Sequence, residues 1–219
     1  HQSQPSLDLC ESAAGKRARS SDRGSVRHGI EQHASWSLHV RRKWLPLIYR
    51  VGKRIGVHAK RIGVHINFAP VTDINTNPNN PIIGSRSFGE DKINVTMKSL
   101  SYLKGMQSEG IMGSAKHFPG HGDTSTDSHK TLPIINFSAK RINDVELFPY
   151  KQLIKNNLST VMVAHMEVPS LEKEPKMPST LSKNIISKLL KKKLKFEGLV
   201  ITDAMDMKGV VDFNKNQSA

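Results

Sequence analysis

The sequence has a single cysteine and no long hydrophobic run. Cys10 cannot form a disulfide bond within the chain or a cysteine-rich metal site, and it gives no information about the redox compartment. No stretch approaches the roughly 20 apolar residues that a membrane-spanning helix needs, and no charged and apolar leader with a small-residue cleavage site begins the chain. We therefore expect a soluble chain. Its localisation, cytoplasmic or outside the cytoplasm, is left open.

Acidic residues are also few relative to basic ones, at 19 against 33, which gives a formal net charge of +14. Such an excess could indicate nucleic-acid binding, because clustered lysines and arginines bind phosphates without sequence preference. The densest basic run, between Lys188 and Lys195, is however interleaved with leucines, as on the exposed face of an amphipathic helix. We therefore expect no nucleic-acid partner.

The chain divides into two stretches of different composition. Residues 1–43 contain few aliphatic side chains, many Ser, Arg and His, and neither a helical nor a strand period, so we expect a disordered or aberrant segment there. From Trp44 to Ile62 apolar residues recur with helical spacing, and Gly63 ends this pattern. We therefore place the folded domain at residues 44–219.

Within that domain, strand-like and helix-like segments alternate with short connections. This alternation is typical of βα units around a parallel sheet and predicts an α/β fold. The predicted strands are Val64–Ala69, Ile111–Lys116, Leu132–Ile135, Thr160–His165 and Leu199–Asp203. The predicted helices lie at about 91–109, at 139–157 with Ser138 as N-cap, and at 183–195 with Ser182 as N-cap.

Polar side chains follow these strands at the points where they end. Asp73 follows the first strand, Lys116 and His117 the second, His165 and Glu167 a later one, and Asp203 the last. In a (β/α)8 barrel the carboxyl ends of the strands meet at one rim, where side chains converge on a substrate. Polar residues can also simply mark strand ends, but the set as a whole favours a site.

The loop after the second predicted strand is the most informative segment. It reads Lys116-His-Phe-Pro-Gly-His-Gly-Asp-Thr-Ser-Thr-Asp-Ser-His129 and holds three His, two Asp and two Gly. This run resembles the signature of family 3 glycoside hydrolases, and its Asp127-Ser-His129 end resembles the β-N-acetylglucosaminidase (NagZ-like) branch. Three further motifs follow the family's order: Asn67-Phe-Ala-Pro-Val-Thr-Asp73, Ser85-Arg-Ser-Phe-Gly-Glu-Asp91 and Val200-Ile-Thr-Asp-Ala-Met205.

The resemblance, which spans roughly residues 45–212, implies a retaining β-N-acetylglucosaminidase that removes terminal β-linked N-acetylglucosamine from peptidoglycan or chitin-type fragments. It implies that Asp203 is the nucleophile that forms a covalent glycosyl-enzyme. It gives the acid/base role to His129, with Asp127 orienting and charging its imidazole. A histidine, with an ordinary pKa of about 6.5, suits a group that must give and take a proton near neutral pH.

The same resemblance assigns the substrate-binding residues. Lys116 and His117 are expected to hydrogen-bond sugar hydroxyls, while Asp73 and Arg86 anchor or shape the same subsite. Arg86 could instead serve only to hold the loop at 75–80 through backbone carbonyls. The resemblance implies a carbohydrate substrate, no cofactor and no metal, and we expect a monomer.

Three alternatives remain at this stage. The first is a β-glucosidase of the same family, and the second is a catalytically silent module that binds carbohydrate or nucleic acid. The third is a zinc site, because imidazoles and carboxylates can bind zinc. The pliable loop and the absence of a His-Glu-x-x-His motif argue against zinc. Its ligands would be His117, His121, Asp123, Asp127 and His129.

The sequence also departs from the family pattern at both ends. The family barrel begins with a strand and an acidic, glycine-rich turn before the helix expected at 45–62, and no such segment is present. The chain stops 16 residues after Asp203. We therefore expect an incomplete (β/α)8 barrel of the TIM type, with roughly five strands and with open edges that a closed barrel eliminates. Such a fragment should be marginally stable alone.

Overall fold

The computed structural model of the protein describes the backbone of residues 44–125 and 131–217. These residues belong to one compact unit, Val40–Ala219. The segment 1–43, expected to be disordered, lies outside the described residues, and its assignment stays a prediction. Asp127 and His129 also lie outside them.

Four parallel strands form one sheet in the order in which they occur along the chain: β1 (Ile66–Asn67), β2 (Met112–Phe118), β3 (Thr160–Val163) and β4 (Leu199–Thr202). Sequential parallel neighbours are what an arc of a (β/α)8 barrel contains, so the predicted α/β class is confirmed. The fifth predicted strand, Leu132–Ile135, is wrong. Only an isolated parallel bridge between Ile134 and Glu167 occurs there, because Pro133 has no N–H to give to a ladder.

Helices connect the strands, as the alternating pattern predicts. They are a helix at 44–61, α2 (Lys92–Gln107), α3 (Ala139–Asp144), α4 (Phe148–Ile154), η2 (Asn184–Lys193) and α5 (Lys208–Gln217), with a short 3₁₀ turn η1 (Gly84–Arg86). The single helix predicted at 139–157 is wrong, because a turn separates α3 from α4. Pro149 lies in the first turn of α4, where its missing N–H costs nothing.

The caps explain where two of these helices begin. Ser138 is the N-cap of α3, as predicted, and its side chain accepts a hydrogen bond from the Arg141 N–H at 3.2 Å. At η2 the N-cap is Lys183 rather than Ser182, although the Ser182 hydroxyl oxygen still accepts from the Ile185 N–H at 3.1 Å. The prediction for η2 was therefore wrong by one residue.

The helix η2 is a π-helix, which the sequence did not predict. Its last turn closes with a bond from the Leu194 N–H to the Leu189 carbonyl, five residues back. Leu189 and Leu190 are buried, whereas the lysines at 188, 191, 192, 193 and 195 are exposed. The basic run is therefore the exposed face of an amphipathic helix, as expected.

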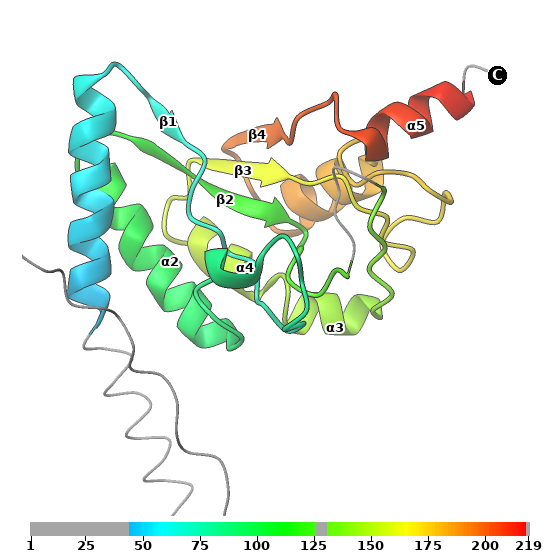
Figure 1. Ribbon diagram of the computed structural model, residues 1–219, viewed down its shortest axis with the longest axis horizontal. Coiled ribbons are helices and arrows are strands. Elements are labelled where there is room, and N and C mark those ends of the chain that lie inside the picture. The colour runs from blue at the N-terminus through cyan, green and yellow to red at the C-terminus, as the bar shows by residue number, and fades with distance from the viewer. Residues whose placement is uncertain (1–43, 126–130, 218–219) are drawn as a thin grey trace, which may run out of the picture. The chain divides into compact units, whose positions relative to one another are not determined.

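The hydrophobic core lies between the sheet and the helices that cover one of its faces. Figure 1 shows α2, α3 and α4 on the same side of the strands. Phe118 of β2 and Tyr150 of α4 are fully buried there and meet edge to face with ring centroids 5.1 Å apart. A Cβ added to Gly105 of α2 would lie 2.2 Å from the Tyr49 carbonyl oxygen, so a glycine is needed where α2 packs against the helix at 44–61.

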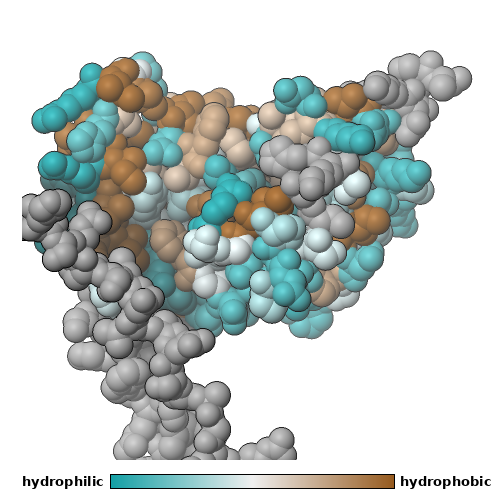
Figure 2. Space-filling model, viewed as in Figure 1, coloured by the Kyte–Doolittle hydropathy of each residue, from teal (hydrophilic) through white to brown (hydrophobic). Residues whose placement is uncertain are grey.

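Large apolar side chains remain exposed away from this core. Phe68 is 49% exposed, and Met112 and Leu199, at the amino-terminal ends of β2 and β4, are 38% and 53% exposed. Figure 2 shows hydrophobic side chains at the surface over the helix at 44–61 and along the strands. Among the described residues β1 and β4 are paired on one side only, so that the sheet stays open at both edges. No helix in the described part of the chain is long and apolar enough to cross a membrane.

Candidate active site

A hollow of about 370 Å³ opens at the carboxyl ends of β2, β3 and β4. Four of the residues predicted to act at the site contribute to its wall: Arg86, Lys116, His117 and Asp203. The other lining residues are Phe68, Ile82, His121, Met162, Ile201, Thr202 and Ala204. Of the polar residues expected at strand ends, Lys116, His117 and Asp203 therefore share one hollow, whereas Asp73, His165 and Glu167 do not line it.

Asp73 lies behind this wall rather than on it. Its buried carboxylate accepts hydrogen bonds from the backbone N–H groups of His117, at 3.1 Å, and of His121, at 2.7 Å. The same carboxylate lies 2.7 Å from His117 Nδ1. Asp73 thus fixes the loop that follows β2. It supports the wall of the hollow from behind, through the backbone of that loop, and its expected part in a sugar subsite stays a prediction.

The protonation of Asp73 follows from these contacts. Burial raises the pKa of its carboxyl group, but the charge of His117, the hydrogen bond from its ring and the contacts with His121 lower it more, so the net pKa lies below its usual value of 3.8. Asp73 is therefore ionised near neutral pH. An ionised carboxylate only accepts hydrogen bonds, so His117 Nδ1 must carry a hydrogen and donate. The other ring nitrogen of His117, Nε2, is left for a ligand.

Lys116 provides the cation of the site. It is half-buried at the end of β2, and its pKa is lowered by burial and by the neighbouring charge of Arg86, while the carboxylates of Asp203 and Asp73 act in the opposite direction. The Lys116 ammonium group therefore interacts electrostatically with the carboxylates of both Asp203 and Asp73. A half-buried lysine among polar groups can bind a hydroxyl-rich ligand.

Arg86 lies in the 3₁₀ turn η1 at the opening of the hollow and is exposed. Its guanidinium group donates to the Ile82 carbonyl at 3.2 Å, within its own turn, and not to the carbonyls of the 75–80 loop. Because Arg86 also lines the hollow, both a structural and a ligand-binding role are compatible with its position.

Asp203 lies directly after β4. Its backbone N–H donates to the Val163 carbonyl at 2.9 Å, which continues the ladder between β3 and β4 by one residue. One carboxylate oxygen, Oδ1, accepts from the Ala204 N–H at 2.9 Å. The side chain is partly exposed and lines the hollow beside Lys116. A carboxylate anchored through one oxygen in an open hollow is suitable for attack on a bound electrophile.

Two histidines have contacts that the sequence did not reveal. His165 is fully buried, with Nε2 2.8 Å from the Ala204 carbonyl oxygen and Nδ1 2.8 Å from the Thr180 hydroxyl. His121 is also buried and lines the hollow. Its Nδ1 lies 2.6 Å from the Thr124 hydroxyl, and its Nε2 has no hydrogen-bond partner among the described residues. From the sequence alone, His165 is predicted only to lie at a strand end, and His121 is considered only as a possible zinc ligand.

The zinc alternative receives no support from the described part of the chain. In residues 44–125 and 131–217, no three His, Cys, Asp or Glu side chains gather as metal ligands would. Burial lowers the pKa of His121, and the charge of Asp73, which raises it, does not fully offset this effect. The net pKa lies below its usual value of 6.5, so the ring is neutral near neutral pH. Two of the five possible ligands, Asp127 and His129, lie outside the described residues. The same two residues form the predicted acid/base pair, so that assignment stays a prediction.

Comparison with known proteins agrees with the resemblance found in the sequence. The sequence model described as the glycosyl hydrolase family 3 N terminal domain matches residues 11–219. The β-hexosaminidase A of Pseudoalteromonas piscicida is 38% identical over 174 residues, which cover 75% of this chain and 29% of that protein. A protein of Cellulomonas fimi named β-N-acetylglucosaminidase/β-glucosidase is 31% identical over 171 residues, or 74% of this chain and 30% of its own length.

A solved structure gives the same result for the fold. The family 3 β-N-acetylglucosaminidase from Paenibacillus sp. str. FPU-7 superposes with a TM-score of 0.75 at 39% sequence identity, covering 77% of this chain and 32% of that one. This similarity confirms that the four strands belong to a barrel of that family's type. The chain spans about 30% of the length of these relatives.

Proposed function

Because this chain belongs to the family of the glycosyl hydrolase family 3 N terminal domain, we propose that the protein carrying it hydrolyses terminal β-linked N-acetylglucosamine with retention of configuration. Its substrates are peptidoglycan or chitin-type fragments. The observation that supports this most is that the carboxylate of Asp203 lines the same hollow as Lys116 and His117. The names of the relatives, β-hexosaminidase and β-N-acetylglucosaminidase, support the choice of an amino sugar.

In the first step a carboxylate oxygen of Asp203 attacks the anomeric carbon, and the bond from that carbon to the leaving oxygen breaks. His129, charged by Asp127, donates a proton to that oxygen. In the second step His129 takes a proton from water, whose oxygen attacks the anomeric carbon and releases Asp203. Two inversions at one carbon give the β-anomer as product. Both residues of the acid/base pair are assigned from the sequence alone.

Lys116 and His117 bind the sugar ring in this proposal. The Lys116 ammonium group donates to ring hydroxyls, and His117 offers Nε2 because Asp73 holds its Nδ1 at 2.7 Å. Asp73 acts through the loop that it fixes and does not touch the sugar. His121 adds an Nε2 atom that is buried and has no partner among the described residues. We assign this atom to the same ring, directly or through water.

A β-glucosidase of the same family is the second candidate, and the double name of the Cellulomonas fimi relative supports keeping it. The two activities differ in whether the site requires the N-acetyl group on the sugar. The Asp127-Ser-His129 sequence favours the amino sugar, because it resembles the N-acetylglucosaminidase branch.

The test uses the protein that carries this chain and a pair of aryl glycosides with the same leaving group, one β-N-acetylglucosaminide and one β-glucoside. We expect kcat/KM to be at least tenfold higher for the N-acetylglucosaminide, and the first product observed by NMR to be the β-anomer. Faster cleavage of the glucoside would favour the second candidate. Absence of both activities, with the protein folded, would favour a silent binding module.

A further inference from the structure

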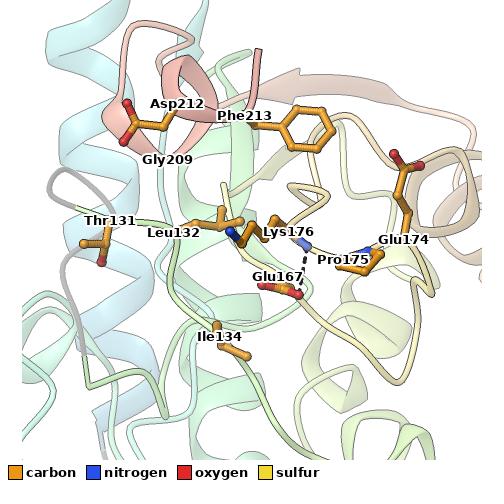
Figure 3. A pocket seen from close by; sticks show the side chains of 10 residues that line it. All are labelled: Thr131, Leu132, Ile134, Glu167, Glu174, Pro175, Lys176, Gly209, Asp212 and Phe213. Atoms are coloured by element: carbon orange, nitrogen blue, oxygen red, sulfur yellow. Dashed lines mark hydrogen bonds between the residues drawn. The ribbon is translucent and has the colours of Figure 1, made fainter. Parts of the chain in front are cut away.

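One buried polar atom at the wall of the active-site hollow has no hydrogen-bond partner. A larger hollow, of about 680 Å³, lies between the segment 131–134, the loop after β3 and α5 (Figure 3). There Glu167 is paired, since its Oε1 accepts from the Lys176 backbone N–H at 2.9 Å. Among the described residues that line these two hollows, only His121 has a buried side-chain atom without a partner, its Nε2. Such an atom needs an explanation, and Nε2 lies where a ligand could supply the partner.

The other ring nitrogen of His121 is held by a neighbour in the same loop. Nδ1 lies 2.6 Å from the Thr124 hydroxyl oxygen, and both side chains are almost completely buried. Because burial lowers the pKa of His121, the ring is neutral near neutral pH and carries a single hydrogen. That hydrogen is either on Nδ1, between the ring and Thr124, or on Nε2. The direction of the hydrogen bond between Nδ1 and Thr124 decides which.

Asn80 determines how the Thr124 hydroxyl is used. Its Oδ1 accepts from the backbone N–H groups of Ile82, at 2.9 Å, and of Ile83, at 2.8 Å. Because these groups only donate, the orientation of the amide is fixed and Nδ2 faces the loop after β2. Nδ2 donates to the His121 carbonyl at 2.8 Å and to the Thr124 hydroxyl oxygen at 3.3 Å. Thr124 thus receives a hydrogen bond and keeps its own hydrogen to donate.

The number of donors around the His121 carbonyl favours one direction. This carbonyl already accepts from Asn80 Nδ2 and, at 3.4 Å, from the Thr124 backbone N–H, which together occupy its two lone pairs. The Thr124 hydroxyl lies 3.1 Å from the same carbonyl oxygen but 2.6 Å from His121 Nδ1. Nδ1 is the closer acceptor and the one not yet occupied, so the hydroxyl donates to it. The single hydrogen of the ring is then on Nε2.

We propose that Thr124 and Asn80 are positioning residues that keep the hydrogen of the His121 ring on Nε2, so that the wall of the hollow offers a donor to the bound sugar, directly or through one water. The proposal rests on the proposed function and adds two residues to its site. The ring of His117 lies 5.8 Å away between centroids, and its Nδ1 donates to Asp73. When neutral, His117 therefore offers an acceptor at Nε2 where His121 offers a donor.

The first test observes the hydrogen on the ring. The protein that carries this chain is labelled with ¹⁵N in its histidine rings, because a ring nitrogen with hydrogen and one without differ clearly in chemical shift. The signals that disappear in His121→Gln identify His121. We expect hydrogen on Nε2 in the unchanged protein and in Thr124→Ser, which keeps the hydroxyl. In Thr124→Val, which removes the hydroxyl and keeps the shape, we expect a mixture of both tautomers. Hydrogen on Nδ1 in the unchanged protein would overturn the proposal.

The second test asks whether the reaction uses this donor. With an aryl N-acetylglucosaminide we expect Thr124→Val to lower kcat/KM roughly tenfold, the effect of one disrupted buried hydrogen bond, and Thr124→Ser to recover most of the loss. The matched control is Thr160→Val. Thr160 is also buried, its hydroxyl donates to the Gly113 carbonyl at 3.1 Å, and it lies at the amino-terminal end of β3, away from the hollow. This control should lower the thermal midpoint but leave kcat/KM as in the unchanged protein.

The outcomes separate this proposal from the proposed function. If the unchanged protein does not cleave the aryl substrate, the proposed function fails, while the NMR signals still decide the tautomer. If it cleaves the substrate but Thr124→Val keeps the hydrogen on Nε2, or changes kcat/KM no more than Thr160→Val does, Thr124 does not position His121 for the reaction. A loss in Thr124→Ser as large as in Thr124→Val would also contradict the proposal, because the hydroxyl would then not be the group that matters.

Discussion

The imidazole of His165 is hydrogen-bonded through Nε2 to the carbonyl oxygen of Ala204, at 2.8 Å, and Ala204 directly follows Asp203. A carbonyl only accepts, so Nε2 carries the hydrogen, and in the neutral ring Nδ1 accepts from the Thr180 hydroxyl at 2.8 Å. Through this bond the buried His165 ring ties the segment after β3 to the residue beside the proposed nucleophile. We therefore infer that His165 positions Asp203.

Replacing His165 tests this role. We expect His165→Ala to lower kcat roughly tenfold to a hundredfold, because small displacements of a catalytic group have effects of that size, with a smaller change in KM. His165→Gln keeps an N–H donor and should recover part of the loss. Thr180→Val, which removes only the bond at Nδ1, is the matched control and should have the smaller effect. A normal kcat in a folded His165→Ala variant would contradict the role.

The substitution Asp73→Asn tests the centre of the polar network. It removes a buried charge that holds His117 and two backbone N–H groups. We expect the free energy of unfolding at pH 7, measured with denaturant, to fall by about 3 kcal/mol. The pKa of Asp73 is lowered in the folded state, so its contribution is present above about pH 3.8 and is lost as the pH falls through the folded pKa. The two proteins should therefore converge in stability toward the acid end, and a difference that grows on acidification would contradict this assignment.

The pair of Lys116 and Arg86 gives a prediction for alkaline pH. Burial, followed by the charge of Arg86, lowers the pKa of Lys116, so its ammonium group loses its proton below its usual pKa of 10.5. Removing the neighbouring charge with Arg86→Gln should raise that pKa and shift the alkaline limb of kcat/KM upward. Lys116→Ala should lower kcat/KM by roughly 10²-fold, as for a lost charged hydrogen bond. An alkaline limb that does not move in Arg86→Gln would show that another group produces it.

The close packing of Gly122 gives a prediction about the loop after β2. An added Cβ would lie 1.9 Å from the Ile74 carbonyl oxygen, and a backbone atom cannot move away as a flexible side chain can. Gly122→Ala should therefore lower the free energy of unfolding by about 3 kcal/mol and displace the site. Gly209→Ala is the control, since its Cβ would meet neighbours only at 3.4 Å. Equal thermal midpoints for the two variants would contradict the packing seen here.

The strands could largely be predicted from the sequence, because each is a short apolar run that ends in polar residues. The predictions for β3 and β4 begin at the observed residue, whereas only Ile66 and Asn67 pair in the six-residue run predicted for β1. Pairing depends on a neighbouring strand, which local sequence does not specify. The break between α3 and α4 lies just before Pro149, which is suited to the first turn of a helix, whereas no residue type in the sequence marks the π-helical form of η2.

The site was predictable only where a motif marks it. The resemblance led to Lys116, His117, Arg86 and Asp203, which the structure brings to one hollow. It did not show that Asp73 acts from behind His117. The bond of His165 to Ala204 joins residues 39 positions apart and leaves no local signal. His121, the second histidine of the loop after β2, is apparent in the sequence, but there it suggests only a metal ligand.

The most direct measurement of the central claim is to trap the covalent intermediate. The protein that carries this chain is incubated with a fluorinated N-acetylglucosaminyl fluoride, which slows release of the glycosyl-enzyme, and is then digested and analysed by mass spectrometry. We predict one attached sugar on the peptide that contains Asp203, and no label in Asp203→Ala. A label on another carboxylate, or an α-anomer as the first product, would contradict the account.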